Sequence, residues 1–329
     1  MTWRNGGDYH PLVNSRKRLA FVLLLATAAA LALAAASPLI AQRSEEALAE
    51  QIGAAIEAGR LDAAISDARR AVERFPQSAQ LHQLLGATLF KKGLNAEARQ
   101  AFQRAIELDP AVPQNHFNLA LVELGENHYA EAAKALEACV KLQPANAQAR
   151  LLLGRAYHNL NRTLPAIEQF RKALELQPQL PLAHYHLGYA YQSQGNLAAA
   201  LAEFEQEIRL NPNFVEAYWL AGNIELGKGN LASAEDHFRR GLRLRPEAVP
   251  GHYGLARVLL GRGELAEAEE AFKKVIELQP QHAEAHYALA RLYQQAGKKE
   301  AAARELEIVA ELHARSARRS SGIAGSRNP

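Results

Sequence analysis

Histidine is the residue type in this chain that most invites a chemical role, because its imidazole binds metal ions and transfers protons. The sequence contains 12 histidines among 329 residues. Five of the histidines recur at multiples of 34 residues, which would place them on equivalent helices of a repeated structure. Such helices lie about 10 Å or more apart, too far for their histidines to share one zinc ion with ligand bonds of about 2 Å. We therefore predict no metal site, and we expect packing roles for the five histidines that recur at multiples of 34 residues: His82, His116, His184, His252 and His286.

Other residue patterns that perform catalysis are missing from the sequence. It contains no Gly-rich phosphate loop, no H-E-x-x-H pair and no G-x-S-x-G turn. Its one cysteine, Cys139, cannot form an intramolecular disulfide, and we interpret it as a small buried thiol. The sequence therefore predicts no catalytic residues, no enzyme activity and no cofactor.

The elements that must position these residues follow a strict period. Seven prolines stand 34 residues apart without an insertion: Pro76, Pro110, Pro144, Pro178, Pro212, Pro246 and Pro280. A self-similar period of this length indicates a stacked repeat array. Counted from 31 residues before each proline, the eight units begin at residues 45, 79, 113, 147, 181, 215, 249 and 283. The place of a residue is numbered below from the start of its unit.

Each unit has the pattern of two helices, as the fifth unit illustrates. Apolar residues from Ala183 to Tyr191 recur at three and four residues, which is the helical period. Gly195 can end that helix with a positive φ, and Asn196 can cap the next helix, expected from Leu197 to about Leu210. Place twenty is Ala in all eight units and place eight is small in seven, which lets the two helices cross closely.

This pattern resembles the tetratricopeptide repeat family, and in the fifth unit the matching residues are Leu187, Gly188, Tyr191, Ala200, Phe204 and Pro212. The resemblance covers about residues 45–316. It implies an all-α fold, a right-handed superhelical solenoid of about eight helix-turn-helix repeats. Three features depart from the family. Histidine takes the usual Trp place in five units, and Gln51 and Ile52 replace Leu-Gly in the first unit. Ala314 stands where the last proline would be, so the last helix can continue into the tail.

The resemblance also implies where a partner binds. In this family the first helices line a concave groove, and places five and nine point into it. Aromatic residues at place five also pack within such repeats, so both interpretations stay open there. The aromatic side chains and interleaved arginines suit an extended or helical peptide with acidic and apolar groups. The predicted partner-binding residues are Phe117, Arg155, Tyr185, Tyr189, Trp219, Asn223, Tyr253, Arg257, Tyr287 and Arg291.

Residues 19–41 form a run of 23 residues without a charge, ten of them Ala and seven Leu. A helix of this length spans about 34 Å, enough to cross a bilayer. The basic segment 1–18 ends in Arg16, Lys17 and Arg18, which places the N-terminus in the cytoplasm and the repeats outside it. Two interpretations fit. One is a single-pass transmembrane anchor, and the other is a signal peptide whose cleavage gives a secreted or periplasmic protein.

The net charge of +3 comes from the two ends of the chain. Residues 1–43 and 312–329 each carry a net charge of +4, which leaves −5 for the repeat body. A mildly acidic array is not expected to bind nucleic acid. Residues 317–329 are rich in Ser, Gly and Arg, and we expect a disordered basic tail there.

These observations predict a non-catalytic scaffold that holds a protein or peptide partner in its groove, as an assembly factor at a membrane. The alternative is a regulatory or substrate-presenting subunit of a cell-envelope enzyme complex. The identity of the partner is not encoded in the repeat pattern, because the pattern fixes only which residues face the groove.

Overall fold

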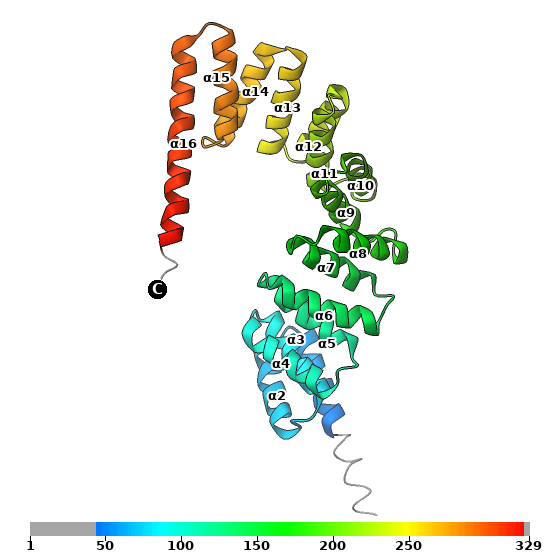
Figure 1. Ribbon diagram of the computed structural model, residues 1–329. Coiled ribbons are helices and arrows are strands. Elements are labelled where there is room, and N and C mark those ends of the chain that lie inside the picture. The colour runs from blue at the N-terminus through cyan, green and yellow to red at the C-terminus, as the bar shows by residue number, and fades with distance from the viewer. Residues whose placement is uncertain (1–43, 326–329) are drawn as a thin grey trace, which may run out of the picture. The chain divides into compact units, whose positions relative to one another are not determined.

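The computed structural model describes residues 44–325, and all secondary structure in that range is helical (Figure 1). The first helix includes residues 44–57. The helices that follow it are α2 (Leu61–Arg74), α3 (Ala79–Lys91), α4 (Asn95–Leu108), α5 (Pro113–Gly125), α6 (Tyr129–Leu142), α7 (Ala147–Asn159), α8 (Thr163–Leu176), α9 (Ala183–Ser193), α10 (Leu197–Leu210), α11 (Val215–Gly227), α12 (Leu231–Leu244), α13 (Val249–Arg262), α14 (Leu265–Leu278), α15 (Ala283–Gln295) and α16 (Lys299–Gly325). The predicted all-α class is confirmed.

The turn between the two helices of a unit depends on place fifteen. Six units have glycine there with a positive φ, and the third and fourth units have Asn127 and Asn161 with φ of 61° and 57°. These are the residue types that adopt the left-handed conformation most readily. In the fifth unit Gly195 has φ of 82°, and the Asn196 side chain accepts a hydrogen bond from the Ala199 N–H, as the sequence predicts.

The two helices of a unit pack through places eight and twenty-four. The Phe ring at place twenty-four lies over the glycine at place eight, so that a Cβ on Gly154 would lie 2.5 Å from the Phe170 ring. On Gly188 it would lie 2.8 Å from the Phe204 ring and 3.1 Å from the Ala200 carbonyl oxygen. The small residues at place eight are therefore required by the close approach of the partner helix.

The five recurring histidines occupy place four, where each side chain contacts the backbone of the preceding repeat. The Nε2 atom of each of the five lies 2.7–3.2 Å from the carbonyl oxygen of the repeat proline six residues earlier. Where histidine is replaced, Arg150 and the Tyr218 hydroxyl donate to the equivalent carbonyls of Pro144 and Pro212. The prediction that these histidines are structural is confirmed, although their role is a hydrogen bond as well as packing.

The described helices divide into two compact units, with the boundary after Gln143. The unit that ends at α6 has a core around Ile52, Leu81 and Phe102. The unit from α7 onward has successive clusters around Phe170, Phe204 with Phe238, and Phe272. Every predicted groove residue except Phe117 belongs to this second unit, so the second unit contains the candidate site.

The helix α9 begins at Ala183, where the helical pattern of the fifth unit begins, and Leu182 before it has a left-handed conformation with φ of 64°. One helix differs from the sequence prediction. The helix α16 runs on to Gly325, so the chain is helical through most of the segment predicted to be a disordered tail. The physical reason is Ala314, since no proline stops the helix at the usual place.

The predicted apolar helix over residues 19–41 lies outside the described residues. Among residues 44–325, no helix is both long and apolar enough to span a membrane. The anchor and signal-peptide interpretations therefore rest on the sequence.

Candidate functional site

The residues at place nine form an exposed row on the first helices of the second compact unit, which begins at residue 144. Its members are Arg155 on α7, Tyr189 on α9, Asn223 on α11, Arg257 on α13 and Arg291 on α15, and all five are exposed. The Arg257 Nη1 donates to the Asn223 Oδ1 at 3.3 Å, so these two members touch across neighbouring repeat units. We call these five residues the place-nine row.

Place five is mostly part of the packing between helices. Trp219 is only 8% exposed, stacks on Phe238 with ring centroids 6.4 Å apart, and lies against Gly241 and Gly251. Tyr185 and Tyr253 are half-buried, and so is Phe117 in the first compact unit. The exception is Tyr287, which is 51% exposed. Of the two interpretations left open for place five, packing applies to Trp219 and exposure to Tyr287.

Aromatic contacts link the place-nine row to place five. Tyr189 and Tyr185 have ring centroids 6.3 Å apart, and His158 of α7 meets Tyr189 edge-on at 5.3 Å. The Arg257 guanidinium lies 5.7 Å from the centre of the Tyr253 ring, which is cation–π geometry. The surface therefore alternates rigid aromatic area with cationic groups, the composition expected of a protein-binding face.

A cavity of about 710 Å³ opens between α13, α15 and α16. Four predicted residues line it, namely Tyr253, Arg257, Tyr287 and Arg291. A second hollow of about 620 Å³ adjoins it and shares Tyr253, Ala283, Glu284 and His313.

The α16 helix contributes Val309 and His313 to the first of these hollows and Leu312, His313 and Arg315 to the second. None of these residues was predicted as a site residue from the sequence, because they lie at the end of the array. The missing proline at Ala314 could have indicated Arg315, because it lets α16 continue past that position, whereas Val309, Leu312 and His313 precede it.

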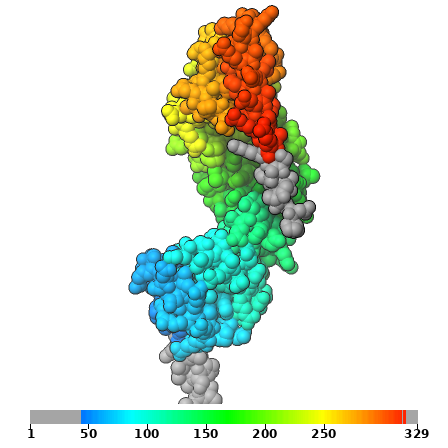
Figure 2. All heavy atoms as spheres, turned by 90° about the vertical axis from the view of Figure 1, so that its left-hand side faces the viewer, coloured from blue at the N-terminus to red at the C-terminus, as the bar shows by residue number. Residues whose placement is uncertain are grey.

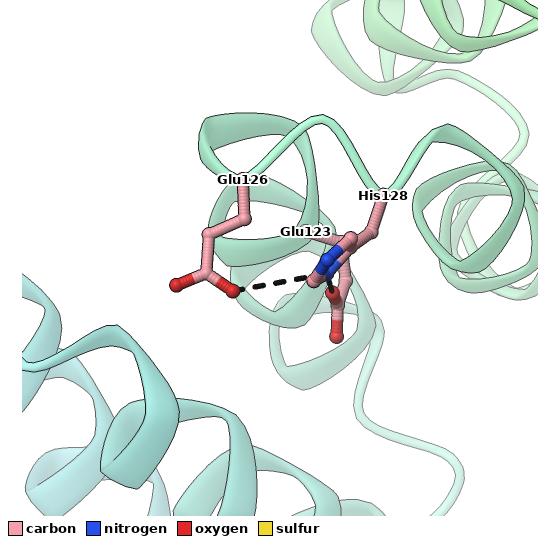
Figure 3. A group of neighbouring side chains, drawn as sticks. All are labelled: Glu123, Glu126 and His128. Atoms are coloured by element: carbon pink, nitrogen blue, oxygen red, sulfur yellow. Dashed lines mark hydrogen bonds and ion pairs between the residues drawn. The ribbon is translucent and has the colours of Figure 1, made fainter. Parts of the chain in front are cut away.

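One cluster has the composition of a metal site, the only such group in the part of the chain that the structure describes. Glu123, Glu126 and His128 point toward one another, with the His128 Nδ1 2.9 Å from the Glu123 Oε2 (Figure 3). However, Arg99 Nε donates to Glu123 at 2.8 Å and its Nη2 donates to Glu126.

The Arg99 guanidinium lowers the pKa of Glu126, chiefly by its hydrogen bond. The positive charge that a metal would supply is therefore already present, and we assign the cluster to an ion-pair network that joins α4 to the end of α5.

Cys139 and His186 are two further groups that could be reactive, and both are shielded from solvent. Cys139 is fully buried in α6, and desolvation raises the pKa of its thiol. A thiol in such surroundings is a poor nucleophile, so the prediction of a packing role is confirmed. His186 stacks on Phe170 with centroids 5.8 Å apart, and burial lowers its pKa to about 4, which keeps the ring neutral.

The family profile described as tetratricopeptide repeat matches residues 50–113, 117–181 and 185–249, and a second profile of the same description matches 259–322. Together they cover most of the chain. The chain belongs to the tetratricopeptide repeat family. No curated protein matches this sequence. The family is one of non-catalytic interaction repeats, and this tetratricopeptide repeat protein is not an enzyme.

Solved structures share the fold at low sequence identity. YrrB, titled a TPR protein with an unusual peptide-binding site, is 20% identical with a TM-score of 0.51, covering 56% of this chain and 95% of its own. PilF of Pseudomonas aeruginosa is 17% identical with a TM-score of 0.54, covering 64% and 96%. MamA is 26% identical with a TM-score of 0.48, covering 49% and 95%.

Proposed function

We propose that this tetratricopeptide repeat protein is a scaffold that binds a partner peptide or protein along the place-nine row. The observation that supports this most directly is the exposure of all five members on consecutive first helices. Residues that served only the fold would be buried, as Trp219 is. Membership of an interaction family supports the same function. The right-handed superhelix stays an expectation from the resemblance.

The row indicates the chemistry of the partner. Arg155 and Arg291 make no side-chain hydrogen bond or ion pair with any residue in the range 44–325, and Arg257 bonds only to a neutral amide. Guanidinium groups in this state bind carboxylates well, because their donors are not already engaged. Tyr189 between them offers apolar area at little cost in side-chain entropy. The partner we propose is therefore a segment with carboxylate and apolar side chains.

We further propose that the repeats lie outside the cytoplasm, held by residues 19–41 or released after cleavage within them. The support is the uncharged run of 23 residues preceded by Arg16, Lys17 and Arg18. An assembly factor at a membrane would use such an anchor to hold its partner close to the bilayer. The other candidate, a regulatory subunit of a cell-envelope enzyme complex, places the array in the same compartment.

Site-specific photocrosslinking in the native cells tests the binding face. A photoreactive amino acid replaces Tyr189 on the place-nine row, and in a matched control it replaces Arg171, which is exposed on the second-helix surface of α8. We expect a discrete crosslinked partner only from position 189, lost on Arg155→Glu with Arg257→Glu. Identical products from both positions, or products from position 171 alone, would contradict binding at the row.

Thiol accessibility tests the location. The native Cys139 is buried, so an exposed Ala202→Cys on α10 provides the reporter. We expect a membrane-impermeant maleimide to label this cysteine without lysis of the cytoplasmic membrane. Labelling only after lysis of that membrane would place the array in the cytoplasm.

A further inference from the structure

Among residues 44–325, the last repeat unit has no following first helix packed against it, unlike the preceding repeats of the second compact unit. There, α12 packs against α13 and α14 packs against α15, so each second helix is covered by the first helix that follows. Place twenty-seven on the covered second helices is buried, at Ala173, Glu207, Gly241 and Val275. The equivalent Val309 on α16 is only half-buried. The side of α16 that faces the viewer in Figure 2 is not covered by another helix.

An internal slot is the surface that the two helices of one repeat present to the first helix of the next repeat, and its contents show what kind of element fits. The slot formed by α11 and α12 is filled by α13, whose Gly251 and Gly254 pack against it. A Cβ on Gly251 would lie 2.7 Å from Trp219, and one on Gly254 would lie 2.3 Å from Phe238. In the next slot, formed by α13 and α14, Ala285 and Leu289 of α15 are buried against Phe272 and Val275. Each occupant is an α-helix with small and apolar residues on one face.

The slot formed by α15 and α16 is empty of protein within residues 44–325. We call it the end slot, and its walls are Tyr287 and Arg291 of α15 with Leu306, Val309 and His313 of α16. Leu306 is 37% exposed, whereas the Phe residues at the same place in earlier units are buried. All of these wall residues except Leu306 line the cavity of about 710 Å³, which also reaches Tyr253 and Arg257 of α13.

The positive charge of the end slot indicates which kind of partner helix would bind there. Arg291 has no hydrogen-bond or ion-pair partner among the described residues, and Arg257 at the far side of the cavity donates only to the Asn223 amide oxygen. The one carboxylate that lines the cavity, Glu284, lies 3.3 Å from the His282 Nδ1. A cationic apolar slot favours a helix that presents an acidic group beside its apolar stripe.

We propose that the end slot binds a single amphipathic α-helix of a partner protein, which takes the position of a ninth first helix and offers a carboxylate to Arg291. This inference rests on the proposed scaffold function and names the partner element at one end of it. In the internal slots, place nine of the entering helix meets place nine of the receiving unit, as the 3.3 Å contact between Arg257 and Asn223 shows. The carboxylate of the partner is therefore expected at its own ninth place.

A second copy of the chain fits this slot less well. The described part of the first helix exposes Glu46, Ala47, Glu50, Gln51 and Ala54. That face has carboxylates for Arg291 but no large apolar side chain to cover Val309 and Leu306. The hydrophobic contribution scales with the apolar area that is buried, so alanines alone would stabilise the contact weakly.

The test uses the full chain and two synthetic peptides with blocked ends. Both have the sequence of residues 283–297, which is the helix that fills the equivalent slot of the seventh unit. One peptide keeps the native Arg at its ninth place, and the other carries Glu there. We expect the Glu peptide to bind at least about tenfold more tightly, with a preference that weakens as salt increases.

Protein variants then locate the binding. Arg291→Glu should reverse the preference between the two peptides, because like charges would then face each other. Val309→Lys should weaken the binding of both by about tenfold or more, since it places a charge in the apolar slot. Ala202→Lys, a matched change at an exposed position of α10, should leave both affinities unchanged.

Three outcomes would overturn the proposal. The first is that neither peptide binds the full chain at about 1 mM, a concentration at which the weakest specific helix docking is still measurable. The second is dimerisation in sedimentation that Val309→Lys abolishes, which would make a second copy the occupant. The third is tighter peptide binding after deletion of residues 1–43, which would make this chain's own N-terminal segment the occupant. Crosslinking from position 189 is unaffected by Val309→Lys if the scaffold function is correct, so the two proposals fail separately.

Discussion

At the scale of single residues, the two hydrogen-bond partners of His184 at place four favour the protonated form of its ring. Its Nε2 must donate to the Pro178 carbonyl at 3.2 Å, because a carbonyl can only accept. Its Nδ1 lies 2.6 Å from the Glu203 Oε2, so the ring donates at both nitrogens when it is positively charged. The hydrogen bond to Glu203 accordingly raises the pKa of His184, against the effect of its burial.

This arrangement predicts a pH-dependent stability. Because the folded pKa of His184 is raised, the stabilisation is fully present below the unfolded pKa of about 6.5 and is lost as pH rises through the folded pKa. Glu203→Gln should therefore cost about 1 kcal/mol at pH 5.5 and clearly less at pH 8.5. Urea unfolding at the two pH values measures this. An equal cost at both would show that His184 is neutral in the folded protein.

Trp219 illustrates how far a residue's role depends on its neighbours. We expect Trp219→Ala to destabilise the protein by about 3–5 kcal/mol, because it leaves a cavity against Phe238, Gly241 and Gly251. Tyr287→Ala, the equivalent change at the exposed end, should cost less than about 1 kcal/mol. Chemical denaturation followed by circular dichroism compares the two. Similar costs would mean that Tyr287 is covered in solution.

At the scale of helices, the period predicted the elements well because local chemistry determines them. Gly195, Asn196 and Asn211-Pro212 limit α10 to Leu197–Leu210, and the structure agrees. The exposure of a side chain was harder to predict, since it depends on residues in the next unit. Trp219 is buried because Gly241 and Gly251 leave room for its ring, and no pattern within its own unit encodes that.

The length of α16 gives a prediction at the same scale. We expect Ala314→Pro to end this helix near residue 312, because proline removes an N–H donor and disfavours helix at the residue before it. The amides of residues 315–325 should then exchange with solvent rapidly, while the global stability changes by less than about 1 kcal/mol. Hydrogen exchange measured by mass spectrometry reports both. Unchanged exchange in 315–325 would mean that α16 already ends earlier in solution.

At the scale of the whole molecule, each repeat contacts only its neighbours. The loss of stability that a mutation causes therefore depends on the position of its repeat along the array. Ala200 and Ala302 both occupy place twenty and both are buried. Ala200 is fully buried in a middle unit, where a Cβ on Gly188 would lie 3.1 Å from the Ala200 carbonyl oxygen, so the two helices are already close and a larger side chain would force them apart. Ala302 lies on α16, which has the open end slot beside it and can move.

We therefore expect Ala200→Leu to destabilise by about 1–3 kcal/mol, the usual cost of overpacking, and Ala302→Leu by clearly less. The last unit can also open without disrupting the rest, so the strain in Ala302→Leu stays local. Thermal unfolding of both variants, with the exposed Ala202→Leu as control, measures the difference. Equal shifts in melting temperature for Ala200→Leu and Ala302→Leu would mean that α16 is held as firmly as the middle helices, which requires an occupant in the end slot.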